Sequence, residues 1–164
     1  MQTKKKHRAE ANQDNNPVVI RRGRAVILKE TKILLCQRIG TDYWYLPGGK
    51  AESEESTGAA LIREILEEVG LRGTLGIFVG VFEYSFFDDR RQRETDEVNV
   101  LLTLSFSSEL PEVVTSKESH LRFEWVECDE LHTKSVLPKE LMRYLSVWLE
   151  KLEPFYGAAT CNTK

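Results

Sequence analysis

The sequence predicts an α+β domain in which two helices pack on a mixed β-sheet. Short β-rich runs dominate the chain, two segments of helical periodicity interrupt them, and strands and helices do not alternate regularly. With 164 residues, 41% of them apolar and 30% charged, the chain can bury one self-sufficient core. We expect the folded domain over residues 17–153, a disordered basic and polar tail at 1–16, and a C-terminal tail at 154–164.

The first strands are expected to form a hairpin. Arg24–Leu28 and Ile33–Cys36 are short β-rich runs, and the polar residues 29–32 between them are typical of a turn. A third short strand is predicted at Tyr43–Leu46, where Pro47-Gly48-Gly49 ends it.

A helix is predicted from Ser56 to Val69. This stretch lacks proline, and its apolar residues recur with the spacing of one buried stripe, at positions 60, 61, 65, 66 and 69. Ser56 or Thr57 can cap its beginning, and Gly70 stands where helices commonly end.

The second half of the chain repeats this mixture of strands and one helix. A second amphipathic helix is predicted over Pro138–Leu152. A charged loop is expected at Asp88–Thr95, and strands are predicted at Leu75–Val81, Glu83–Phe87, Val98–Phe106 and Phe123–Val126.

The charge of the chain is concentrated in one short stretch. The whole sequence has 23 basic and 26 acidic residues, which argues against a general nucleic-acid-binding protein. Residues 49–71 contain six Glu against one Lys and one Arg, a net charge of −4, so the rest of the chain sums to +1. Such a local excess of carboxylates requires a partner or a cation.

Composition also predicts the compartment. Cys36, Cys128 and Cys161 are widely separated and odd in number, which fits a reducing, cytoplasmic location better than a disulfide framework. No apolar run approaches the length of a membrane helix, so we expect a soluble protein. The basic residues Lys4–Arg8 are interpreted as part of a solvated tail; nuclear import or nucleic-acid binding is the alternative.

The helix at 56–69 carries the strongest chemical signal. Glu64, Glu67 and Glu68 stand at i, i+3 and i+4, so their carboxylates project from one face and repel each other. A solvated acidic face is one interpretation. The preceding Pro47–Gly49 backbone and three further Glu at positions 52, 54 and 55 favour the other, a cluster of hard oxygen ligands for Mg²⁺ or Mn²⁺.

At these residues the sequence resembles the Nudix hydrolases. The segment from Gly49 to Leu71 matches the complete Nudix box: Gly49, five residues, Glu55, seven residues, then Arg63-Glu64-Ile65, one residue, Glu67-Glu68, one residue, and Gly70-Leu71. The flanking Trp44–Gly49 and Glu124–Glu127 are similar to the family as well. The resemblance implies an α/β/α sandwich with a mixed β-sheet between helices, and hydrolysis of a nucleoside diphosphate linked to another moiety.

The resemblance also implies roles for the box residues. Glu67 and Glu68 are the leading metal ligands, Glu64 is a third ligand or the general base, and the Gly48 carbonyl completes the shell around Mg²⁺. Arg63 holds the carboxylates in position by charge-assisted hydrogen bonds. The candidate catalytic residues are therefore Arg63, Glu64 and Glu67.

Weaker candidates lie outside the box. Glu97 opens a strand at a position where relatives supply another metal-binding carboxylate, and Glu118 stands in a loop where some place their base. Arg38 resembles an arginine that faces the phosphates. Tyr43 and Trp44 could stack on a base, although at strand spacing at least one of the aromatic residues at 43–45 belongs to the core.

Several functions stay open at this point. A metal-dependent pyrophosphohydrolase is favoured, with ADP-ribose, a sugar nucleotide or a nucleoside triphosphate among the candidate substrates. The alternatives are a Nudix-fold module that binds a nucleotide without cleaving it, and a pyrophosphohydrolase of RNA 5′ ends. A homodimer is neither indicated nor excluded by any sequence feature.

Overall fold

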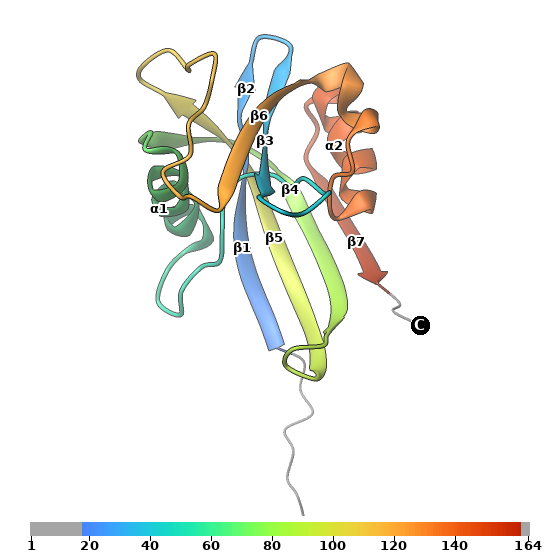
Figure 1. Ribbon diagram of the computed structural model, residues 1–164. Helices are drawn as coiled ribbons and strands as arrows, with labels where there is room; N and C mark the ends of the chain where they lie inside the picture. The colour runs from blue at the N-terminus through green and yellow to red at the C-terminus, as the bar shows by residue number, and fades with distance from the viewer. Residues whose placement is uncertain (1–17, 162–164) are drawn as a thin grey trace, which may run out of the picture.

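The computed structural model describes residues 18–161, which form two β-sheets flanked by two helices (Figure 1). The expected tail at 1–16 lies outside these residues. The predicted sandwich of helices around mixed β-structure is confirmed. Its elements are β1 (Val18–Val26), β2 (Leu28–Lys29), β3 (Lys32–Arg38), α1 (Thr57–Val69), β4 (Gly73–Asp88), β5 (Arg93–Phe106), β6 (Leu121–Glu127), the 3₁₀ helix η1 (Cys128–Thr133), α2 (Lys139–Lys151) and β7 (Phe155–Cys161).

The larger sheet has the strand order β1-β5-β4-β7 and is mixed. β1 runs parallel to β5, β5 pairs with β4 in the antiparallel sense, and β7 runs parallel to β4. The smaller sheet, β2-β3-β6, is antiparallel throughout. α1 packs against β1 and α2 packs against β7, so the helices lie at opposite sides of the sheets in Figure 1.

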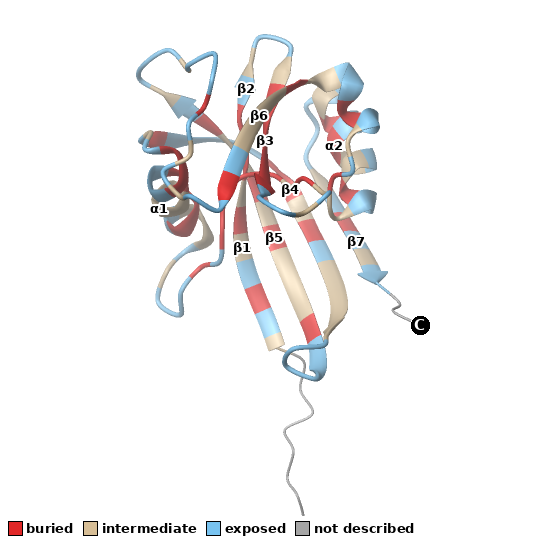
Figure 2. Cartoon of the chain, viewed as in Figure 1, coloured by how far each residue is buried: buried red, intermediate tan, exposed pale blue. Residues whose placement is uncertain are grey.

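β1 and β3 each contribute side chains to two core clusters, because successive side chains of a strand point in opposite directions. Leu34 of β3 joins a cluster under α1, whereas its neighbours Ile33 and Leu35 join a second cluster under α2. In β1, Ala25 and Val26 divide between the clusters in the same way. Figure 2 shows buried residues on the inward sides of both helices.

Both predicted helices are confirmed, with ends close to those expected. The Ser56 hydroxyl oxygen caps α1 by accepting from the Ala59 N–H at 3.1 Å, and Gly70 ends it in the left-handed conformation. Pro138 and Leu152 flank α2 as its caps. Within residues 18–161 no helix is both long enough and apolar enough to cross a membrane.

The strands are longer than the sequence predicts. β1 begins at Val18 rather than Arg24, and the strands expected at 75–81 and 83–87 form the single strand β4, with irregular pairing between Leu75 and Gly80. The loop expected at 88–95 narrows to residues 89–92, because Asp88 pairs with Arg93 across the hairpin. Pairing between two long strands extends β-structure through polar residues that the sequence pattern assigns to a loop.

The segment Tyr43–Leu46 is not the predicted strand. Its pairing divides between two partners: Tyr45 bridges to Cys36 of β3, and Trp44 bridges to Val136 ahead of α2. No continuous ladder forms, since neither partner follows the segment for more than one residue.

The expectation of a C-terminal tail is wrong for residues 155–161, which form β7 beside β4. The segment carries few large apolar residues, so hydropathy does not predict it. Small side chains let it approach closely: a Cβ at Gly157 would lie 2.8 Å from Tyr144 and 2.9 Å from Phe82. Its stability therefore comes from its neighbours rather than from its own sequence.

Replacing Trp148 by Ala is expected to lower the free energy of unfolding by about 3–5 kcal/mol. Trp148 is 1% exposed and packs α2 into the core, whereas its neighbour Val147 is 45% exposed. The control Val147→Ala should change stability by less than about 1 kcal/mol. Urea denaturation measures both; equal stabilities of the two variants would contradict the packing of α2.

Candidate active site

The loop before α1 is fixed to β1 by its backbone. The Gly23 N–H donates to the Gly49 carbonyl at 3.0 Å, and the Ala25 N–H donates to the Pro47 carbonyl at 2.8 Å. Between these bonds Gly48 has φ +119°, and a Cβ there would lie 2.3 Å from the Gly23 carbonyl oxygen. Glycine at this position therefore lets the loop backbone lie directly between β1 and α1.

Two box carboxylates from α1 lie against this loop. Glu68 is 6% exposed, and its Oε2 accepts a hydrogen bond from the Gly48 N–H at 3.3 Å. Burial raises the pKa of Glu68 to about 7, and the charge of Glu64 acts in the same direction. The Glu64 carboxylate fills the space where a Cβ of Gly49 would be. Removing the Glu68 carboxylate from water beside the charge of Glu64 favours binding of a cation.

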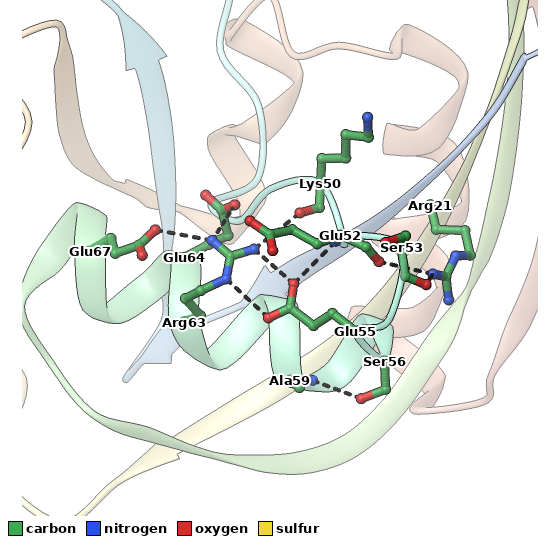
Figure 3. Close-up of polar contacts among 10 residues, drawn as sticks. All are labelled: Arg21, Lys50, Glu52, Ser53, Glu55, Ser56, Ala59, Arg63, Glu64 and Glu67. Carbon is green, nitrogen blue, oxygen red and sulfur yellow. Dashed lines mark hydrogen bonds and ion pairs between the residues drawn. The ribbon is translucent and has the colours of Figure 1, made fainter.

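Arg63 organises the carboxylates of the box (Figure 3). Its guanidinium donates to both oxygens of Glu55 at 3.0 and 2.9 Å, to Glu64 at 2.9 Å and to Glu67 at 3.1 Å. A further bond reaches the Lys50 carbonyl at 3.2 Å. The paired bonds from Arg63 lower the pKa of Glu55. The predicted positioning contacts of Arg63 are therefore present.

Charged groups on the larger sheet continue the site. Arg22 of β1 pairs with Glu97 of β5 at 2.9 Å, and Arg24 donates to Asn99 at 3.2 Å. Arg24 also donates to the Gly48 carbonyl at 3.1 Å, and burial lowers its pKa. Neither arginine stands out in the sequence as a site residue, although their alternation along β1 places them on one face.

These groups surround a cavity of about 680 Å³. Glu118 and His120 border it, with the Glu118 Oε2 and His120 Nε2 atoms 3.3 Å apart. The complete lining comes from β1, β4, β5, β6, β7, α1 and the connecting loops: Arg22, Arg24, Tyr43, Tyr45, Gly48, Gly49, Lys50, Glu64, Glu68, Tyr84, Phe86, Phe87, Glu97, Glu118, His120, Leu121, Leu137, Pro138 and Cys161.

The structure brings most of the predicted site residues to this cavity, namely Tyr43, Gly48, Glu64, Glu68, Glu97 and Glu118. Glu67 lies outside the lining, with a side chain that is 52% exposed and bonded to Arg63. Among residues 18–161, no three His, Cys, Asp or Glu side chains converge as a ready set of metal ligands. The role of Glu67 stays a prediction.

Three further candidates from the sequence are absent from the cavity lining, and one of them, Arg63, contacts the lining residue Glu64. Trp44 is 6% exposed in the core, where the Arg122 guanidinium lies 5.0 Å from its ring. Arg38 is exposed at the end of β3 and is absent from the lining. Tyr43 and Trp44 are neighbours in one aromatic run, but only Trp44 bridges to Val136 before α2, and its side chain is buried.

The fold and the residues of the site are those of one class of protein domain. Residues 19–147 match the family described as the NUDIX domain. Since this match covers most of the chain, the chain belongs to that family, as the box implied.

Similarity to individual proteins is more limited. A segment of 52 residues, 32% of this chain, is 48% identical to human diphosphoinositol polyphosphate phosphohydrolase 3-beta and spans 30% of that protein. The MutT protein from Bacillus halodurans shares the fold with a TM-score of 0.69 at 20% identity, over 88% of this chain and 91% of that one. The MutT protein from Methanosarcina mazei Go1 has a TM-score of 0.66 at 20% identity, over 84% and 97% of the chains.

Proposed function

We propose that the protein is a Mg²⁺-dependent pyrophosphohydrolase that cleaves the diphosphate linkage of a nucleoside diphosphate derivative. The buried carboxylate of Glu68 beside Glu64 carries this proposal. Burial of the Glu68 carboxylate beside the charge of Glu64 costs stability unless a cation compensates it. The intact Nudix box and membership of the family support the same function.

The donor set fits a hard divalent cation. Glu64, Glu68 and the Gly48 carbonyl would hold Mg²⁺, with Mn²⁺ as an alternative, because the cluster supplies only oxygen atoms. Glu67 and Glu97 are further candidate ligands. When bound, the cation neutralises charge on the diphosphate and lowers the pKa of water.

The protein's own side chains account for the rest of the chemistry. Arg63 keeps Glu55, Glu64 and Glu67 in fixed positions, so that Glu64 can serve as a ligand or accept the proton of the attacking water. Arg22 of β1 lines the cavity and serves as a cation that binds phosphate. Its ion pair with Glu97 fixes the orientation of the guanidinium. Arg24 holds the Gly48 carbonyl in place by donating a hydrogen bond to its oxygen.

Charge in the cavity favours a nucleotide over an inositol polyphosphate. The curated relatives are named for diphosphoinositol polyphosphates, but the chain spans under a third of the length of the relative compared above. The lining supplies Arg22, Arg24 and Lys50 against four carboxylates. The three cationic side chains can pair with the phosphates of one diphosphate, whereas a ring bearing many phosphates would need more cations than the lining supplies.

A substrate panel with Mg²⁺ tests the proposal. We expect release of phosphate-containing products from at least one of ADP-ribose, a sugar nucleotide and a nucleoside triphosphate, and complete loss of turnover in excess EDTA. Restoration by Mg²⁺ controls for irreversible damage. Turnover that persists in EDTA would contradict the metal dependence, and wild-type protein that binds these nucleotides without cleaving them would support the non-catalytic alternative.

A further inference from the structure

The β5–β6 connection, residues 107–120, brings Glu118 and His120 to the cavity. In Figure 1 this connection leaves the end of β5, passes α1 and reaches the start of β6. Val114 in its middle is buried in the core cluster under α1. At its end, the Ile39 N–H donates to the His120 carbonyl at 2.8 Å. The connection is therefore held against the domain on both sides of Glu118.

Ser116 joins the β5–β6 connection to the last turn of α1. Its Oγ accepts a hydrogen bond from the Glu118 N–H at 3.1 Å. The hydroxyl can donate its proton to the Glu118 carbonyl at 2.9 Å or to the Glu68 carbonyl at 3.4 Å. The Lys117 N–H donates to the same Glu68 carbonyl at 2.7 Å. Carbonyls in the last turn of a helix lack partners within it, so these bonds satisfy the end of α1 and fix residues 116–118 to it.

The backbone of Glu118 is bound on both sides. Its N–H donates to Ser116, and its carbonyl accepts from the Leu121 N–H at 3.1 Å. Its carboxylate lines the same cavity as that of Glu68. Burial is the main cause of the raised pKa of Glu68, and the negative charge of Glu118 acts in the same direction, so the two carboxylates lie within electrostatic reach of each other. A cation bound by Glu68 would therefore also be attracted by Glu118.

We propose that Ser116 is a positioning residue, which ties the β5–β6 connection to α1 and holds the Glu118 carboxylate where it strengthens binding of the divalent cation. This inference rests on the proposed function for the presence of that cation. Ser116 is absent from the cavity lining, so it acts through Glu118 rather than by contact with a ligand. The end of α1 thus contributes twice: it carries the Glu68 carboxylate, and its backbone fixes the segment that carries Glu118.

Binding of Mn²⁺ alone, followed by the electron paramagnetic resonance signal of the free ion, tests this role without depending on turnover. Ser116→Ala should weaken binding about tenfold, the lower end of the loss typical of a residue that orients a metal ligand. Ser116→Thr keeps the hydroxyl group and should bind Mn²⁺ within about twofold of wild type. In a Glu118→Gln protein, Ser116→Ala should weaken binding no further. Amide hydrogen exchange at Glu118 should become faster in Ser116→Ala, because its N–H loses its acceptor.

Thr115→Ala is the matched control, because Thr115 is the exposed neighbour of Ser116 in the same connection. It should leave Mn²⁺ affinity and exchange at Glu118 unchanged. The positioning role would be overturned if Ser116→Ala left either property unchanged, or if it weakened Mn²⁺ binding by the same factor with and without Glu118→Gln. Wild-type protein that does not bind Mn²⁺ would overturn the cation site as well. Mn²⁺ binding without turnover in the substrate panel contradicts the proposed function alone.

Discussion

Glu68→Gln is expected to lower turnover by about 10²-fold or more and, in the metal-free protein at pH 8, to raise the free energy of unfolding. The substitution keeps the shape of the side chain and the acceptor for the Gly48 N–H, but removes the buried charge. Loss of a ligand should cost at least as much as loss of a residue that orients one, about 10- to 100-fold. Steady-state kinetics at saturating Mg²⁺ measures this loss.

The stability effect has a defined pH dependence. Burial raises the pKa of Glu68 from 4.5 to about 7, so the folded state holds its proton more tightly than the unfolded state. The resulting stability is complete below pH 4.5 and is lost as the pH rises through 7. The loss corresponds to about 3 kcal/mol above that range. Metal-free Glu68→Gln should lack this decline.

Two other glutamates serve as controls for Glu68. Glu67→Gln should also lower turnover, but its half-exposed side chain predicts little change in stability. Glu150→Gln, on the exposed surface of α2, should change neither property. Full activity of Glu68→Gln in Mg²⁺, or a pH-independent difference in stability from wild type, would exclude Glu68 from a buried, charge-compensated site.

Gly49→Ala is expected to lower turnover at little cost in stability, whereas Gly48→Ala is expected to lower stability. A Cβ at Gly49 would lie 2.2 Å from the Glu64 Cδ, and a side-chain end can move aside at little cost in stability. Displacing Glu64 should lower turnover about 10- to 100-fold. A Cβ at Gly48 would meet the Gly23 backbone in a left-handed conformation, so this variant should lose about 3 kcal/mol or more of stability.

Gly40→Ala isolates the cost of backbone conformation, since Gly40 has φ +89° and open space around its Cα. Kinetics and urea denaturation of the three variants give the comparison. If Glu64 is the group that Gly49→Ala displaces, combining that change with Glu64→Gln should lower turnover no further than Glu64→Gln alone. Fully additive losses would show that Gly49 acts through another group.

The sequence alone determined the acidic helix and the cluster of carboxylates on it. Ser56, Gly70 and the apolar stripe between them are local signals, so the limits of α1 and the common face of Glu64 and Glu68 followed from helical geometry. The sequence also indicates that the Gly48–Gly49 backbone can approach that helix, because the two segments are neighbours in the chain.

The tertiary structure decided everything that depends on distant partners. Register across β1, β5 and β4 brings Arg22, Glu97 and Tyr84 to one face, and no spacing within a single strand shows which strands will be neighbours. Trp44 is buried in the core, whereas its neighbour Tyr43 lines the cavity. The sequence does not distinguish these two aromatic residues, because their burial depends on packing against distant segments. β7 forms because it pairs along β4. Hydrogen bonds to a neighbouring strand can order a segment that has too few apolar side chains to fold by itself.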